Sequence, residues 1–207
     1  MTDINPSPET AAQHKVKMEK KKAARDKIMA SKTEARGLII VHTGKGKGKS
    51  TAAWGLALRA MGHGQKVGIV QFVKGEWETG ERTVLEERFS DLCQIRALGR
   101  GFSWESQDLE KDIAAAQGAW DATMQMMSDE SIDLVICDEI NIAFRYGHLD
   151  PKTIVGELMQ RRAGLHVVLT GRNAPEELVE AADLVTEMTL IKHPFRSGVK
   201  AQAGVEF

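Results

Sequence analysis

Short runs rich in Val, Ile and Leu alternate with longer segments of helical character from Gly37 onward, and few folds accommodate such an alternation. Strands that are apolar at nearly every position are typical of parallel sheets, in which helices cover both faces. The sequence therefore predicts an α/β fold: a single three-layer domain with a mostly parallel sheet of about six strands. We expect the strands at Leu38–His42, Lys66–Val73, Leu92–Ala97, Ile132–Cys137, Leu165–Thr170 and Leu184–Leu190.

Helix candidates fill the intervals between these strands. Asp150 and Pro151 mark the start of one helix, and Gly164 lies beyond its end, as helix boundary preferences predict. The expected helices are Ser50–Met61, Thr79–Phe89, Gln107–Met127, Pro151–Arg162 and Pro175–Ala182. In sheets of this kind, ligands bind outside the carboxyl ends of the strands. The residues that directly follow each strand are therefore the candidates for a functional site.

The first 36 residues differ from the rest of the chain in charge. They contain nine Lys and Arg against five acids, which gives a local charge of +4, whereas the whole chain carries −1. We expect residues 1–36 to form a basic N-terminal tail or a lone helix, and residues 37–207 to form the folded domain. The charge of −5 that remains on the domain disfavours a broad nucleic-acid-binding face.

Cysteine content and hydropathy indicate the compartment. Cys93 and Cys137 are too few for a disulfide framework, and no apolar stretch approaches the roughly 18 residues that cross a membrane. The N-terminus lacks the apolar core of a secretory signal, and its acids argue against a transit peptide. These features predict a cytoplasmic protein without a membrane partner.

A glycine-rich loop joins the first expected strand to the first expected helix of the domain. It reads Thr-Gly-Lys-Gly-Lys-Gly-Lys-Ser over residues 43–50, which is the context that a phosphate-binding P-loop requires. Glycines allow backbone N–H groups to converge on phosphate oxygens at a helix N-terminus. Lys49 is expected to neutralise phosphate, and the Ser50 hydroxyl is expected to bind Mg²⁺. The candidate residues for binding the nucleotide, ATP or GTP, are Thr43, Gly44, Lys45, Gly46, Lys47, Gly48, Lys49, Ser50, Thr51 and Arg172.

Two features of the loop leave alternatives open. The first glycine of the common P-loop pattern would fall at position 43, where this chain has Thr43. A flexible turn between a strand and a helix is the alternative explanation for the glycines. Lys45 and Lys47 either contact phosphate or are solvated.

Acidic and basic residues follow two later strands. Asp138 and Glu139 end an apolar run in a Walker-B-like pattern, so they are candidates for holding Mg²⁺ together with Ser50. Asp138 alone would also be compatible with a helix cap. Arg172 follows the fifth strand, where its guanidinium suits a phosphate oxygen. The alternative is a surface arginine beside a helix cap at Asn173.

Three of the chain's few aromatic residues lie in segments that follow strands two and three. Trp77, Phe102 and Trp104 are flanked by glycine and polar residues. They are candidates for an apolar wall against a large flat ligand, or they pack the loops onto the edge of the sheet.

The order of the motifs resembles the P-loop class of bacterial corrinoid adenosyltransferases, from about Gly37 to the C-terminus. The matching stretches are TGKGKGKSTAA at 43–53, RAMGHG at 59–64, VGIVQFVKG at 67–75, GER at 80–82, GFSW at 101–104, DE at 138–139, TGR at 170–172, KHPF at 192–195 and GVKAQAG at 198–204. A P-loop alone has low specificity, whereas this ordered series is highly specific.

The resemblance implies a RecA-like nucleotide fold and an adenosyl transfer. Such enzymes transfer the 5′-deoxyadenosyl group of ATP to the Co(I) centre of a corrinoid (cobalamin, cobinamide or cobyrinic acid a,c-diamide) and release triphosphate, in adenosylcobalamin biosynthesis or salvage. The implied co-substrate is ATP, with Mg²⁺ or Mn²⁺. By the same resemblance, Lys49, Glu139 and Arg172 are expected to be catalytic, and Phe102, Trp104 and Trp77 are expected to contact the corrinoid.

The resemblance also implies partners. It predicts a homodimer and an electron donor such as a reduced flavoprotein. Residues 1–36 are expected to form a lid helix over the active site or a disordered tail.

Two other functions fit parts of the sequence. A RecA-like NTPase would bind nucleic acid through the basic N-terminal segment. A P-loop kinase would need an acceptor-site signature, which we do not find in the sequence.

Overall fold

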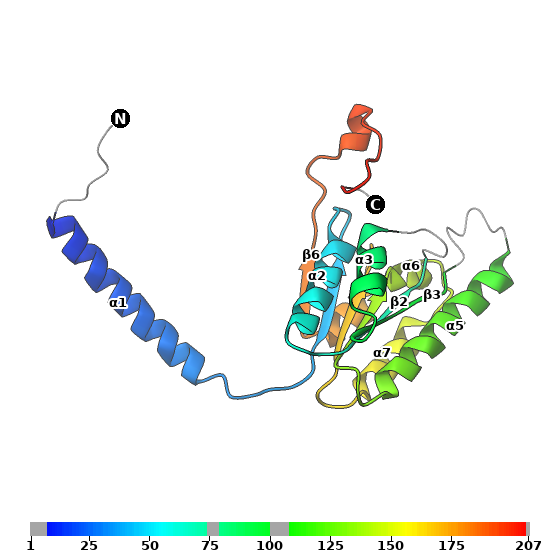
Figure 1. Cartoon of the computed structure of the whole chain (residues 1–207), viewed down its shortest axis with the longest axis horizontal. Helices are drawn as coiled ribbons and strands as arrows, with labels where there is room; N and C mark the ends of the chain where they lie inside the picture. Colours follow the sequence, from blue (N-terminus) through cyan, green and yellow to red (C-terminus); the bar gives the residue numbers. More distant parts are fainter. Residues whose placement is uncertain (1–7, 74–78, 100–107, 206–207) are drawn as a thin grey trace. The chain divides into compact units, whose positions relative to one another are not determined.

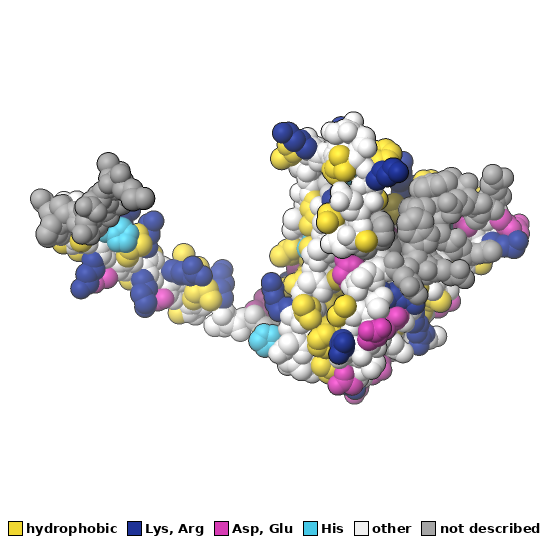
Figure 2. Space-filling model, turned by 45° about the horizontal axis from the view of Figure 1, so that its top comes forward, with side chains coloured by type: hydrophobic (Ala, Val, Ile, Leu, Met, Phe, Trp, Pro, Cys, Tyr) yellow, Lys and Arg dark blue, Asp and Glu magenta, His cyan; other side chains and the backbone are white. Residues whose placement is uncertain are grey.

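The computed structural model describes residues 8–73, 79–99 and 108–205. The chain divides into two compact units, Met1–Ala35 and Arg36–Phe207. In the first unit, helix α1 spans Pro8–Ala30, and every described side chain from Thr10 onward is exposed. Lys and Arg side chains are distributed along this helix (Figure 2), and Lys22 forms an ion pair with Asp26 one turn later. Helix α1 therefore lacks a wide apolar stripe of its own.

The second unit is built around a six-stranded sheet (Figure 1), with the strand order β3-β2-β4-β5-β1-β6. Every neighbouring pair is parallel. The strands are β1 (Ile39–Thr43), β2 (Val67–Gln71), β3 (Cys93–Ala97), β4 (Leu134–Asp138), β5 (His166–Thr170) and β6 (Leu184–Glu187). The predicted α/β class is confirmed. Strand β5 lies between β1 and β4, so the residues after β5 lie between the P-loop and the Asp-Glu pair.

Helices cover both faces of the sheet, because the side chains of each strand alternate between two apolar clusters. Val135 and Cys137 of β4 pack with helix α5, whereas Leu134 and Ile136 pack with helix α2. Helices α5 (Leu109–Ser128), α6 (Ile140–Arg145), α7 (Pro151–Met159) and α8 (Glu176–Ala181) contribute to the first cluster, and α2 (Lys49–Gly62) and α3 (Gly80–Arg88) contribute to the second. The result is the expected three-layer arrangement.

The structure differs from the predicted elements at a few boundaries. Strand β6 ends at Glu187 instead of Leu190, and α7 ends at Met159 instead of Arg162. Helix α6 and the 3₁₀ turn η1 (Pro194–Ser197) have no counterpart among the predicted elements. Within the described residues, no helix combines the length and apolar character that a membrane crossing requires.

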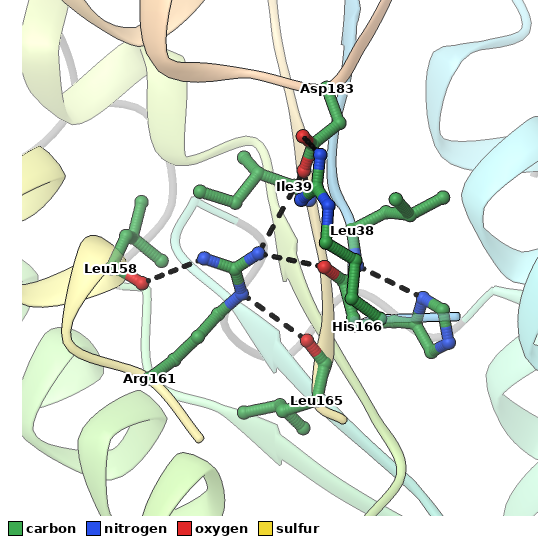
Figure 3. Close-up of polar contacts among 9 residues, drawn as sticks. Leu38, Ile39, Leu158, Arg161, Leu165, His166 and Asp183 are labelled. Carbon is green, nitrogen blue, oxygen red and sulfur yellow. Dashed lines mark hydrogen bonds and ion pairs between the residues drawn. The ribbon is translucent and has the colours of Figure 1, made fainter. Parts of the chain in front are cut away.

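A polar cluster fixes the beginning of β1, at the end of the sheet opposite the P-loop (Figure 3). Arg161 donates to the carbonyl oxygens of Leu158, Leu165 and Gly37 at 2.9–3.2 Å. Asp183 accepts a hydrogen bond from the Ile39 N–H at 2.8 Å. These contacts join the loop after α7 and the start of β6 to the start of the P-loop strand.

Asp183 is expected to make folding sensitive to acid. Its hydrogen bonds from the Arg36 guanidinium and from the Ile39 N–H lower the pKa of its carboxyl. The resulting stabilisation is complete above the ordinary aspartate pKa of about 3.9 and is lost as pH falls through the lower folded-state pKa. Asp183→Asn is expected to reduce the free energy of unfolding at pH 7 by about 1–2 kcal/mol. Urea titrations at pH 7 and below test this. An unchanged midpoint, equal to that of a Glu180→Gln control on the surface of α8, would contradict it.

Candidate active site

A pocket of about 770 Å³ opens at the carboxyl edge of the sheet. Its walls come from the P-loop, from both ends of the segment between β2 and α3, from α6, from the residue after β5, and from the C-terminal segment. The lining residues are Gly46, Lys47, Gly48, Lys49, Ser50, Thr51, Val73, Thr79, Gly80, Glu81, Glu139, Ile142, Arg145, Tyr146, Arg172, Gly204 and Val205. The pocket therefore occupies the position where α/β sheets bind ligands.

The P-loop presents an uncapped helix N-terminus to this pocket. Gly48 precedes α2 with φ 102° and gives it no side-chain cap, and the first turn of α2 contains no acid. The first N–H groups of a helix lack partners within the helix, and the helix dipole adds partial positive charge there. This end of α2 is suited to an anion such as phosphate.

Close contacts with the backbone after β6 leave no room for a side chain at two loop glycines. A Cβ at Gly44 would lie 2.5 Å from the Met188 carbonyl oxygen, and a Cβ at Gly46 would lie 2.7 Å from the same atom. The Gly46 N–H donates to this oxygen at 2.6 Å, and the Met188 N–H donates to the Thr43 carbonyl at 2.9 Å. The chain after β6 therefore supports the P-loop from the side.

Gly46→Ala is expected to displace the loop and to weaken ATP binding by about tenfold or more, because overpacking costs about 1–3 kcal/mol. Gly55→Ala is the matched control. It lies in the interior of α2, and nothing would be within 4 Å of its Cβ. Calorimetric titration with ATP distinguishes the two variants. Equal ATP affinities of the two variants would contradict the role of the Gly46–Met188 contact in holding the loop.

Lys49 is the buried cation of the pocket. It is 5% exposed, and its Nζ donates to the Gly46 carbonyl at 2.5 Å. Burial lowers the pKa of Lys49, Glu139 raises it, and Arg172 lowers it. The Lys49 ammonium is thus held away from water and inside the loop, where its attraction to a phosphate group is less screened.

Thr170 contacts both acids at the end of β4. Asp138 is 1% exposed, and its Oδ1 accepts a hydrogen bond from the Thr170 hydroxyl at 2.8 Å. The Glu139 N–H donates to the same hydroxyl oxygen at 2.8 Å. Glu139 has φ 63° and begins α6, so its side chain leaves the strand direction and reaches the pocket.

Asp138 forms no ion pair within the part of the chain that the structure describes. Burial of a carboxylate is energetically costly, and the positive charge of Lys49 offsets part of that cost. Asp138, Glu139 and Ser50 all offer oxygen atoms, which are the ligands that Mg²⁺ prefers. The described residues contain no cluster of three His, Cys, Asp or Glu that would form an all-protein metal cage. The residues present therefore fit a Mg²⁺ ion that is bound together with substrate phosphates.

Thr43 connects the P-loop to the segment after β5. Its hydroxyl accepts a hydrogen bond from the Ala174 N–H at 3.0 Å, and the Gly171 N–H donates to the His42 carbonyl at 3.2 Å. These contacts place Arg172 at the pocket, although its side chain is exposed.

Comparisons with known proteins identify the family of the chain. Residues 35–207 match the family model described as ATP:corrinoid adenosyltransferase BtuR/CobO/CobP. The chain belongs to this family. Residues 2–29 match a second model, described as Cob(I)alamin adenosyltransferase N terminal.

Curated corrinoid adenosyltransferases are similar over most of their length. A Sinorhizobium sp protein is 55% identical over 203 residues, which cover 98% of this chain and 95% of that protein. The Pseudomonas aeruginosa protein is 47% identical, over 99% of this chain and 100% of its own. The Escherichia coli K12 protein is 42% identical, over 88% of this chain and 91% of its own.

The structure of this ATP:corrinoid adenosyltransferase brings together many of the site residues that the sequence predicted. Lys47, Lys49, Ser50, Thr51, Glu139 and Arg172 line one pocket, together with Gly46 and Gly48. Thr43, Gly44, Lys45 and Asp138 are not among the lining residues. Trp77, Phe102 and Trp104 lie outside the described residues.

Sequence reasoning did not identify several pocket residues of this adenosyltransferase. Ile142 and Arg145 come from α6, Tyr146 directly follows this helix, and Gly204 and Val205 come from the C-terminal segment. The Arg145 guanidinium lies 5.6 Å from the centre of the Tyr146 ring. Their position in the sequence was the one signal that could have pointed to the α6 residues, because α6 directly follows the Asp-Glu pair.

Proposed function

We propose that Lys49 and Arg172 serve adenosyl transfer by stabilising the triphosphate that leaves ATP. Family membership identifies the chain as an ATP:corrinoid adenosyltransferase. The main support for the residue assignment is the buried Lys49 ammonium beside the uncapped N-terminus of α2, with Arg172 in the same pocket. This arrangement suits a polyphosphate that carries several negative charges.

The bond changes explain why cationic groups are sufficient for much of the catalysis. The Co(I) corrinoid donates an electron pair to C5′ of the ATP ribose, so a cobalt–carbon bond forms. The bond between C5′ and the triphosphate oxygen breaks, and triphosphate retains that electron pair. Negative charge therefore develops on the leaving oxygen, where fixed positive groups lower the barrier. The nucleophile carries no proton, so no general base is required.

A metal ion is proposed as part of this site. Ser50, Asp138 and Glu139 would hold Mg²⁺ or Mn²⁺, which would neutralise phosphate charge when bound. Asp138 is oriented by Thr170, and the Glu139 backbone is fixed by the same hydroxyl. These contacts hold the Asp138 carboxylate and the Glu139 backbone before any substrate binds.

A direct assay tests the proposal. The protein is incubated with ATP, Mg²⁺ and a chemically reduced corrinoid, and the products are separated. We expect a light-sensitive adenosylated corrinoid and one equivalent of triphosphate. Formation of ADP and phosphate alone would overturn the proposal.

The corrinoid-facing wall stays a prediction from the sequence. Trp104→Ala is expected to raise the KM for the corrinoid by about tenfold or more, because a lost aromatic contact removes buried apolar surface. ATP affinity is expected to stay within twofold of the parent, an approximate margin for an unaffected site. Steady-state kinetics with each substrate varied in turn measures both effects. An equal loss for both substrates would argue against a separate corrinoid wall.

Further properties are proposed from the family resemblance. A reductase, such as a reduced flavoprotein, would supply the electron that generates Co(I). The enzyme is proposed to be a cytoplasmic homodimer, in which residues 1–36 form a lid or tail and residues 37–207 form the catalytic domain. Sedimentation equilibrium of the full chain tests the dimer. Kinetics of a chain lacking residues 1–36 tests the lid.

A further inference from the structure

The segment that carries Arg172 has an unusual backbone on both sides of that residue. Gly171 has φ 131° and Asn173 has φ 56°. Residues with a side chain rarely adopt a positive φ such as that of Asn173. Such a conformation persists where surrounding contacts fix it. The position of Arg172 therefore depends on what holds its neighbours.

Three hydrogen bonds hold this turn. Two come from β1: the His42 carbonyl accepts from the Gly171 N–H, and the Thr43 hydroxyl accepts from the Ala174 N–H. The third comes from α6, where Asn141 Nδ2 donates to the Gly171 carbonyl at 2.8 Å. Asn141 is thus the link between the Arg172 turn and the helix that Glu139 begins.

Packing makes this link rigid. Asn141 is fully buried, with 0% exposure. A Cβ at Gly171 would lie 2.7 Å from the Asn141 Cβ, so the two residues approach as closely as a glycine permits. A small rotation of α6 would therefore move the Gly171 carbonyl, and with it the backbone of Arg172.

Asn141 is poorly suited to a purely packing role. Its Oδ1 is buried without a hydrogen-bond partner among the described residues. An unsatisfied buried amide oxygen is destabilising, and an apolar side chain of similar size would avoid that cost. The amide therefore contributes through its donor group, which within the described residues donates a hydrogen bond only to the Gly171 carbonyl.

We infer that Asn141 is a positioning residue for Arg172, and that it sets the position of the guanidinium relative to Glu139 during triphosphate departure. This inference rests on the proposed role of Arg172. Thr170 directly precedes Gly171, and its hydroxyl contacts Asp138 and the Glu139 N–H. Two consecutive residues at the end of β5 thus connect the acids after β4 to the arginine after β5.

A double-mutant cycle tests the inference on the full chain. The variants are Asn141→Leu, Arg172→Ala and the double substitution, each assayed for kcat and for both KM values. Asn141→Leu is expected to lower kcat by about 10- to 100-fold, since small displacements of a catalytic group have effects of this size. In the Arg172→Ala background, the same substitution is expected to change kcat by less than about twofold, because interacting sites are not additive.

Matched variants separate positioning from folding. Thr123→Val removes another fully buried polar group, a hydroxyl on α5 that bonds the Ala119 carbonyl. It is expected to lower the melting temperature without changing kcat. If Asn141→Leu does not fold, Asn141→Ala and Asn141→Ser provide the same cycle with smaller side chains.

The outcomes distinguish this inference from the proposed function. If Arg172→Ala lowers kcat and the Asn141 effect multiplies with it, Asn141 has only a structural role and the inference is wrong. If Arg172→Ala retains the parental kcat, the proposed role of Arg172 fails, and the inference fails with it. A kcat for the double variant equal to that of Arg172→Ala supports both.

Discussion

Lys49→Ala is expected to lower kcat for triphosphate release by about a thousandfold, the upper range for loss of one group that stabilises developing negative charge. The Lys49 ammonium is buried inside the loop, and alanine leaves no positive charge in its place. Its pKa is lowered by burial, yet Glu139 and Asp138 counteract that shift, and contact with bound phosphate would favour the charged form further.

Single-turnover assays measure this loss directly. Enzyme in excess over ATP is mixed with reduced corrinoid, and triphosphate is quantified with time. Lys152→Ala provides the control, because Lys152 is an exposed lysine on α7 and does not line the pocket. Comparable ATP affinity and rate for Lys49→Ala and the control would contradict the P-loop assignment.

Asp138→Asn is expected to lower turnover by about a hundredfold or more and to weaken the Mg²⁺ dependence of ATP binding. The amide oxygen can still accept the Thr170 hydrogen bond, so the substitution removes the charge while preserving the shape. A lost metal contact removes several kcal/mol of charge stabilisation, and about 1.4 kcal/mol corresponds to tenfold in rate.

Metal titration supplies a second measurement for Asp138. ATP affinity is determined by calorimetry at increasing Mg²⁺, and the metal concentration at half effect is compared between variants. Asp91→Asn is the control, because Asp91 is exposed in the turn before β3. An unchanged Mg²⁺ dependence in Asp138→Asn would show that this carboxylate does not hold the metal.

The strands could be predicted because their signal is local. Strands β2, β4 and β5 are largely apolar runs of five residues, and every strand lies within its predicted range or extends one residue beyond it. Strand β6 is shorter than predicted, because Met188 leaves the ladder and bonds the P-loop backbone. That contact depends on the approach of two segments more than 140 positions apart, which no local pattern records.

Helix α6 was missed for a related reason. Its six residues follow an apolar strand without a break, and Ile140, Asn141, Ala143 and Phe144 are all buried. A helix buried on most sides lacks the polar face that gives a helical period in sequence. The pocket wall that it forms, including Tyr146, was therefore missed as well.

The sequence by itself determined the parallel α/β fold and the P-loop, because a strand, a glycine-rich turn and a helix are consecutive in the chain. Only the tertiary structure decided which distant residues complete the site. The strand order places β5 between β1 and β4. As a result, the Thr170 hydroxyl donates a hydrogen bond to Asp138, and Asn141 donates one to the Gly171 carbonyl. The tertiary structure also provides a second reason for the glycines of the P-loop, since the backbone at Met188 leaves no room for a side chain at Gly44 or Gly46. Such contacts depend on strand order and close packing, which are properties of the folded chain.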